Sequence, residues 1–143
     1  MTPDRLELTL AADPLVLGLL RRRMMRFLEV AGAGEVDRFE ITLGVCEAAS
    51  NAIEHAYGPG DADFGVEASV TEGQVTVAVT DSGNWRDARE PVGELPGARG
   101  RGLRIIEGLM DTVDVSRGER GTTVTMRRRL GARGDAVTSA GDR

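Results

Sequence analysis

Residues 47–55 of the chain read Glu-Ala-Ala-Ser-Asn-Ala-Ile-Glu-His. Glu47, Asn51 and His55 follow one another at intervals of four residues, so a helix would place all three near one face. A carboxylate and an amide one turn apart suit Mg²⁺, which prefers oxygen donors. The carboxylate can alternatively take a proton from a hydroxyl group or water that attacks a phosphate. Taken alone, a solvated polar helix face explains the same stripe.

This stretch ends a longer predicted helix. Asp37, with Glu40 three residues later, resembles a capping box at its start. Residues 57–60, Tyr-Gly-Pro-Gly, stop the helix. Much of its apolar face is predicted to consist of Phe39, Leu43, Cys46 and Ile53.

A preceding helix is predicted from Asp13-Pro14 to Gly32, because aspartate caps a helix, proline suits its first position and glycine ends it. Its apolar stripe contains Val16, Leu20, Met24, Phe27 and Ala31. Its arginines are predicted to lie on the solvent-exposed face: Arg21, Arg22, Arg23 and Arg26. These arginines fit either a solvated face or a surface for an acidic partner.

Strands are predicted where apolar and polar residues alternate, at 6–10, 64–70, 75–79, 113–115 and 124–126. The second and third strands form one hairpin and the last two form another. Segregated helices and hairpin-linked strands indicate an α+β fold, a two-layer sandwich with helices on one face of a mixed, mostly antiparallel sheet. The order excludes the alternating pattern of a dinucleotide-binding fold.

Residues 81–102 are rich in glycine and proline, which predicts a functional loop such as a lid. At its start, Asp81 follows a strand and can accept a hydrogen bond from an exocyclic amine, while Gly83 lets backbone approach a flat base. A plain turn explains Asp81-Ser82-Gly83 equally well.

The other end of this loop is Gly100-Arg101-Gly102, directly before a short predicted helix over 103–110. Glycines there expose backbone amides, and a helix N-terminus attracts anions. Arg99 and Arg101 could pair with phosphate oxygens. The alternative to a phosphate-binding loop is that these glycines simply precede a helix and have no role in binding. Taken alone, Gly121-Thr122-Thr123 would be interpreted as the end of a hairpin.

The composition narrows the choice of function. The 143 residues predict one domain over 1–130, with disorder expected in the small, polar tail 131–143. A single cysteine cannot form an intramolecular disulfide, which fits a protein of the reducing cytoplasm. The sequence has no apolar run long enough to span a membrane. The net charge of -5 argues against general nucleic-acid binding. All 18 basic residues are arginine, which excludes the lysine-dependent P-loop and the usual protein-kinase phosphate clamp.

Together these motifs resemble the ATP-binding domain shared by gyrase, the Hsp90 chaperone, histidine kinases and MutL, which has the Bergerat-type fold. The chain is most similar to the bacterial anti-sigma-factor serine/threonine kinases of partner-switching systems. Four stretches carry the resemblance, which covers roughly residues 5 to 130: 47–55, 81–83, 100–103 and 121–122. The short length, without a dimerisation helix pair or transducer domain, selects the anti-sigma branch.

The resemblance implies a role for each matching residue. Asn51 would coordinate Mg²⁺ and Glu47 would be the general base. Asp81, with Gly83 and Thr122, would form the adenine pocket. The lid backbone around Gly100, Gly102 and Leu103 would wrap the phosphates. His55 receives no role, and Asn84-Trp85 departs from the family pattern Asp-x-Gly-x-Gly, which leaves nucleotide affinity and the path of the lid open.

The implied function is an ATP- and Mg²⁺-dependent anti-sigma factor that phosphorylates a serine of an anti-anti-sigma (STAS-type) protein. Relatives of this kind are typically dimers. The alternative is a nucleotide-binding module that gates partner binding without kinase activity, which the Trp85 departure motivates. A histidine-kinase fragment is disfavoured, because His55 lies within the asparagine motif itself and no separate phospho-acceptor helix is present.

Overall fold

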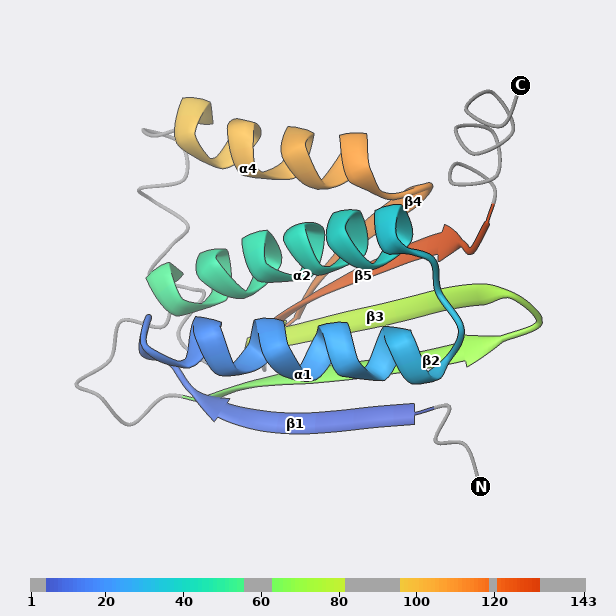
Figure 1. The fold of residues 1–143 in the computed structure, drawn as a ribbon. Coiled ribbons are helices and arrows are strands. Elements are labelled where there is room, and N and C mark those ends of the chain that lie inside the picture. Colours follow the sequence, from blue (N-terminus) through green and yellow to red (C-terminus); the bar gives the residue numbers. More distant parts are fainter. Residues whose placement is uncertain (1–4, 56–62, 82–95, 119–120, 132–143) are drawn as a thin grey trace.

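A computed structural model describes residues 5–55, 63–81, 96–118 and 121–131, with the backbone alone at 55 and 96–101. Three helices lie on one face of a five-stranded sheet (Figure 1). The elements in chain order are β1 (Arg5–Ala11), α1 (Val16–Val30), α2 (Glu35–His55), β2 (Asp63–Thr71), β3 (Gln74–Asp81), α4 (Pro96–Leu109), β4 (Thr112–Gly118) and β5 (Gly121–Arg129).

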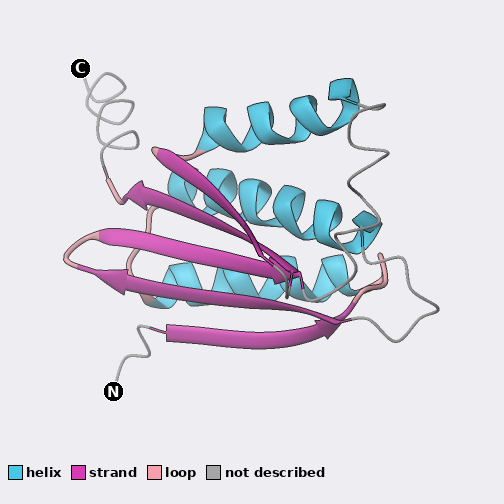
Figure 2. Cartoon of the chain, turned by 180° about the vertical axis from the view of Figure 1, so that it is seen from behind, coloured by secondary structure: helices cyan, strands magenta, loops and turns pink. Residues whose placement is uncertain are grey.

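The sheet has the strand order β1-β2-β3-β5-β4, and each neighbouring pair is antiparallel. The view from behind shows the opposite face of the sheet without a helix over it (Figure 2). The predicted α+β two-layer fold is therefore confirmed, including both hairpins. The β2–β3 hairpin turns through Glu72 and Gly73, both at positive φ, as a two-residue turn between twisted strands requires.

The middle helix, α2, packs its small residues on the sheet. Its buried apolar positions are Ile41, Val45, Ala48, Ala49 and Ala52. The predicted apolar face of this helix was partly wrong, since Phe39 is 62% exposed and Leu43 is 43% exposed. Apolar residues occur on several sides of the helix, and the side that is buried is the one with Ile41, Val45 and the three alanines. Phe39 and Leu43 instead line a groove beside α1.

The first helix confirms the predicted division of its faces. Leu20, Met24 and Phe27 are buried, as predicted, and the arginines at 21–23 and 26 are exposed. The helix begins at Val16 rather than at Pro14, and Asp13 accepts a hydrogen bond from the backbone N–H of Leu15 at 3.0 Å.

Two other helices also begin at residues that differ from the prediction. The second helix begins at Glu35, and its supposed capping residues Asp37 and Glu40 bind Arg128 instead. The last helix begins at Pro96, so Gly100-Arg101-Gly102 lies within α4 and not in a loop before it. Proline is favoured in the first turn of a helix, and packing of α4 along α2 outweighs the low helix propensity of glycine.

The predicted tail lies outside the described residues after Gly131. Among the residues described, the structure contains no helix long and apolar enough to cross a membrane.

Candidate nucleotide site

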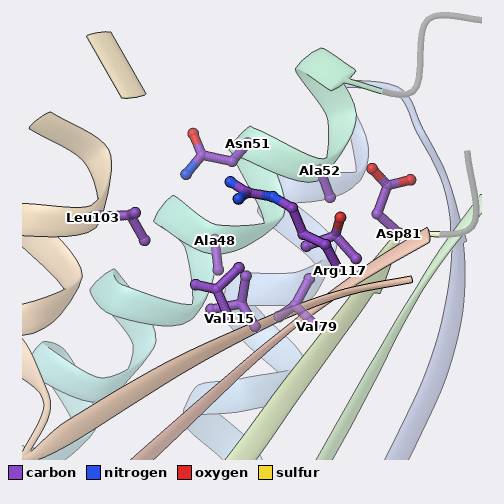
Figure 3. A pocket seen from close by; sticks show the side chains of 10 residues that line it. Ala48, Asn51, Ala52, Val79, Asp81, Leu103, Val115 and Arg117 are labelled. Atoms are coloured by element: carbon purple, nitrogen blue, oxygen red, sulfur yellow. The ribbon is translucent and has the colours of Figure 1, made fainter. Parts of the chain in front are cut away.

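A narrow pocket opens between α2, α4 and the ends of three strands (Figure 3). Its volume of about 40 Å³ holds only a few water molecules, so a base could enter only if a wall moved. The described residues that line the pocket are Ala48, Asn51, Ala52, Val79, Asp81, Leu103, Val115, Arg117, Thr122 and Val124.

Asp81 and Thr122 are buried polar residues at the base of the pocket, beside apolar side chains. Asp81 ends β3 and pairs directly with Thr122 at the start of β5. Asp81 is 2% exposed and Thr122 is 3% exposed. The hydroxyl oxygen of Thr122 is buried and has no hydrogen-bond partner among the described residues. Burying a polar group without a partner is costly, and because Thr122 lines the pocket, its hydroxyl is placed where a ligand or a water molecule could bind it.

The helix face of Glu47 and Asn51 meets the backbone of α4 at one point. A Cβ built on Gly102 would lie 3.1 Å from Nδ2 and 3.4 Å from Oδ1 of Asn51, and 3.3 Å from Oε2 of Glu47. The amide and the carboxylate therefore converge on the position that Gly102 leaves open. Asn51 also lines the pocket, so Glu47, which meets Asn51 at Gly102, lies beside the pocket as well.

The donor set fits Mg²⁺. Asn51 and Glu47 offer oxygen atoms, and Mg²⁺ commonly takes one or two protein oxygens and fills its shell with water and phosphate. No cluster of three or more His, Cys, Asp or Glu side chains occurs within the described ranges. Asn51 remains the predicted ligand.

The structure brings together most of the residues predicted from the sequence. Asn51, Asp81, Leu103 and Thr122 line one pocket, and Glu47 adjoins it through Gly102. Gly83 lies outside the described residues. The backbone of residues 99–101 is helical, while the predicted phosphate contacts of these arginine side chains lie outside what the structure describes, as does the side chain of His55.

The sequence interpretation missed the contribution of β4. Val115 and Arg117 line the pocket, and Figure 3 shows the Arg117 side chain extending from β4 toward α2. The prediction paired this strand with β5 in a hairpin, and the structure adds that it is the edge strand of the sheet. The register of the β4–β5 hairpin puts Arg117 directly opposite Thr122.

A second cavity, of about 660 Å³, lies between α1 and α2. Its walls include Phe39 and Leu43, together with Arg21, Arg22 and Arg26. Cys46 also lines this groove, where burial raises the pKa of its thiol and the charge of Arg21 partly offsets the effect. The groove combines exposed apolar side chains with positive charge and lies apart from the nucleotide pocket.

Comparison with known proteins found a matching family and several relatives. Residues 10–128 match the model of the family described as Histidine kinase-like ATPase domain. The serine-protein kinase RsbW of Halalkalibacterium halodurans is 29% identical over 124 residues, which cover 79% of this chain and 76% of that protein. RsbW of Bacillus pumilus is 28% identical, with 87% of this chain and 85% of that protein covered.

Solved structures support the same fold. A crystal structure of the RsbU and RsbW domains of a Mycobacterium tuberculosis protein superposes with a TM-score of 0.72 and 28% identity. The match covers 90% of this chain but only 33% of that longer chain. The SiaB–SiaC complex of Pseudomonas aeruginosa gives a TM-score of 0.61 at 14% identity, covering 87% of this chain and 88% of that one, and is a likeness of fold alone.

Proposed function

Because the chain belongs to the histidine kinase-like ATPase domain family, we propose that it is an ATP-dependent protein serine/threonine kinase and anti-sigma factor. It phosphorylates a serine of an anti-anti-sigma (STAS-type) protein and binds a sigma factor, in the cytoplasm. The observation that carries the proposal is the convergence of Glu47 and Asn51 on Gly102, beside a pocket with a buried Asp81. The relatives named serine-protein kinase support the reaction type.

The pocket offers contacts of the kind that an adenine ring would make. Its apolar walls suit the faces of a flat base, and Asp81 can accept a hydrogen bond from the exocyclic amino group. The buried hydroxyl of Thr122 supplies a second polar contact on the neighbouring strand. The pocket is too narrow for the base as it stands, so the proposal includes a movement of α4, whose Leu103 forms one wall.

Phosphoryl transfer rests mainly on positioning and electrostatics. Glu47 accepts the proton of the substrate serine as the serine oxygen attacks the γ-phosphorus of ATP. The bond between that phosphorus and the β,γ-bridging oxygen breaks, and ADP leaves. Mg²⁺, with Asn51 as its proposed ligand, would neutralise charge on the phosphate oxygens.

The groove between α1 and α2 is the proposed contact surface for a protein partner. Its exposed arginines favour an acidic surface, and the neighbouring Phe39 offers an apolar anchor. Reversing the charges of Arg22 and Arg26, which line the groove, is expected to weaken sigma binding and to leave ATP affinity unchanged. Unaltered sigma affinity would exclude this surface. A homodimer is the proposed assembly, which light scattering tests.

The deciding experiment combines calorimetry with transfer of ³²P from ATP to the anti-anti-sigma proteins of the same organism. Asn51→Ala is expected to abolish Mg²⁺-dependent ATP binding. Glu47→Ala should bind ATP but lose about 100-fold or more in transfer, the usual contribution of a general base. Glu54→Ala removes an exposed carboxylate from the same helix and serves as the matched control.

Three results would change the proposal. Absence of ATP binding by the wild-type protein overturns all of it. Binding without transfer to any partner leaves the nucleotide-gated binding module in place of the kinase. Equal loss of transfer in the Glu47 and Glu54 variants removes the general-base assignment.

A further inference from the structure

A buried arginine ties together the two helices that hold the candidate site. Arg128 lies near the end of β5, in the row of side chains that faces the helices, and is 0% exposed. The other members of that row are Thr122, Val124 and Met126. An arginine is rarely buried to this extent unless its charge is paired, so its partners explain its position.

The guanidinium of Arg128 donates three hydrogen bonds. Nη2 donates to Oδ1 of Asp37 at 2.8 Å, and Nη1 donates to Oε1 of Glu40 at 2.8 Å. Nη1 also donates to the carbonyl oxygen of Leu109 at 2.9 Å. The second carboxylate oxygen of Asp37 accepts from the backbone N–H of Gly131 at 2.8 Å. One side chain thus joins the first turns of α2, the last residue of α4 and the strand β5.

The contact with Leu109 lies at the C-terminal end of α4. The last carbonyl groups of a helix have no partner within the helix, and positive charge there is favourable. Close packing secures the same end, because a Cβ on Gly44 of α2 would lie only 2.8 Å from Cε of Met110. The end of α4 near Leu109 is therefore fixed both by charge and by shape.

The opposite end of α4 lies over the candidate site. The two helices run antiparallel (Figure 1), so the end of α4 that Arg128 holds lies at the start of α2, and Gly102 lies at Asn51 and Glu47. Seven residues separate Gly102 from Leu109, a rise of about 10 Å in an α-helix. A tilt of about 10° at the fixed end would thus move Gly102 by about 2 Å.

We propose that Arg128 is a positioning residue for nucleotide binding, because it anchors the fixed end of α4 and so sets where Gly102 and Leu103 lie over Asn51. The effect of Arg128 on nucleotide binding rests on the proposed function, which places the ATP site between α2 and α4. Entry of a base into the narrow pocket then moves the end of α4 near Leu103, while the Arg128 end stays in place. Without this anchor, of the two contacts described above only the packing of Met110 against Gly44 holds the Leu109 end of α4.

Arg128→Lys is the test variant, because lysine keeps the charge but cannot bind two carboxylates and a carbonyl in the same planar fork. Arg127→Met is the matched control, since Arg127 is the neighbouring residue on β5 and makes only an exposed ion pair with Asp114 at 3.3 Å among the interactions described. Two quantities are measured on the full chain: amide hydrogen exchange over residues 103–109, and the Kd for ATP with Mg²⁺.

Arg128→Lys is expected to accelerate exchange in residues 103–109 by about tenfold or more, as loss of a charge-assisted hydrogen bond implies. Exchange in β2 and β3 should stay close to the wild-type rate, and the Kd for ATP should rise by about threefold to tenfold. Arg127→Met should change neither quantity. A uniform rise over the whole chain would show a merely structural role, and unchanged exchange over residues 103–109 would likewise overturn the proposal.

A milder variant keeps the test decisive if Arg128→Lys does not fold. Glu40 is about one third exposed, so Glu40→Ala removes one partner and leaves the buried pair of Arg128 with Asp37 intact. Faster exchange confined to α4 is again the supporting result, and its absence overturns the proposal. If the wild-type chain binds no ATP, the proposed function fails, while the exchange data still decide whether Arg128 anchors α4.

Discussion

Replacing Gly102 with alanine would place a methyl group in the narrow space between α4 and α2. Its distances of 3.1 Å from Asn51 and 3.3 Å from Glu47 are shorter than an ordinary contact, so both side chains must retreat by a few tenths of an ångström. In an uncrowded helix interior the same substitution stabilises a protein by about 0.5–1 kcal/mol. Crowding a packed site costs about 1–3 kcal/mol, so the helix gain should be cancelled or reversed.

The chain contains a matched control for this substitution. Gly108 lies in the same helix, and a Cβ built on it meets no atom within 4 Å. Gly108→Ala should therefore raise the free energy of unfolding by about 0.5–1 kcal/mol, an increase in Tm of about 2–4 °C. Gly102→Ala should show no such rise in calorimetry. Its kcat/KM for phosphoryl transfer should fall by about tenfold, since displacing catalytic groups by 1 Å can cost about 100-fold.

The comparison has a clear refuting result. If Gly102→Ala and Gly108→Ala gain the same stability and both retain wild-type transfer, α4 is not seated on Asn51 and Glu47 in solution. The convergence of these two side chains on Gly102 would then lose its functional meaning.

Three further perturbations test other parts of the structure. Thr122→Val removes a buried hydroxyl without a partner among the described residues, so denaturant unfolding should show unchanged or slightly higher stability, while ATP affinity falls by about threefold to tenfold. Arg128→Met leaves Asp37 buried and unpaired and should cost about 3–5 kcal/mol in the same measurement, against less than about 0.5 kcal/mol for Arg127→Met. Burial raises the pKa of the Cys46 thiol, so its alkylation by iodoacetamide at pH 7.5 should be slower than that of a free thiol. The alkylation should accelerate only at higher pH or on unfolding. A rate equal to that of free cysteine would contradict the burial of Cys46.

The layered fold was predictable because alternation in the strands and helical spacing in α1 are local patterns. The buried face of α2 was not, because apolar residues surround that helix and only the space above the sheet decides that Ala48 is covered while Phe39 is exposed. The start of α4 was missed for a similar reason: glycine at 100 and 102 predicts a loop, and packing along α2 keeps the segment helical.

In the candidate site, too, some residues were predictable from the sequence and others were not. Asn51, Asp81 and Thr122 lie in short motifs whose order along the chain is informative, and the structure brings them into one pocket. Arg128 binds helix residues about 90 positions earlier in the chain, so spacing carried no signal for it, whereas Arg117 lies opposite Thr122 in the predicted second hairpin and was overlooked. The carboxylates of Asp37 and Glu40 were taken for a helix cap, because a local pattern cannot reveal a partner about 90 residues away.

The pocket joins both layers of the molecule, with walls from α2, from α4 and from three strands of the sheet. A molecule bound there would act as a cross-link between the helices and the sheet. Binding to the folded state alone stabilises a protein by mass action, about 2.7 kcal/mol at a ligand concentration 100 times Kd. The proposed ATP site thus implies that resistance to proteolysis, and the lifetime of the protein in the cell, rise and fall with the cell's supply of ATP.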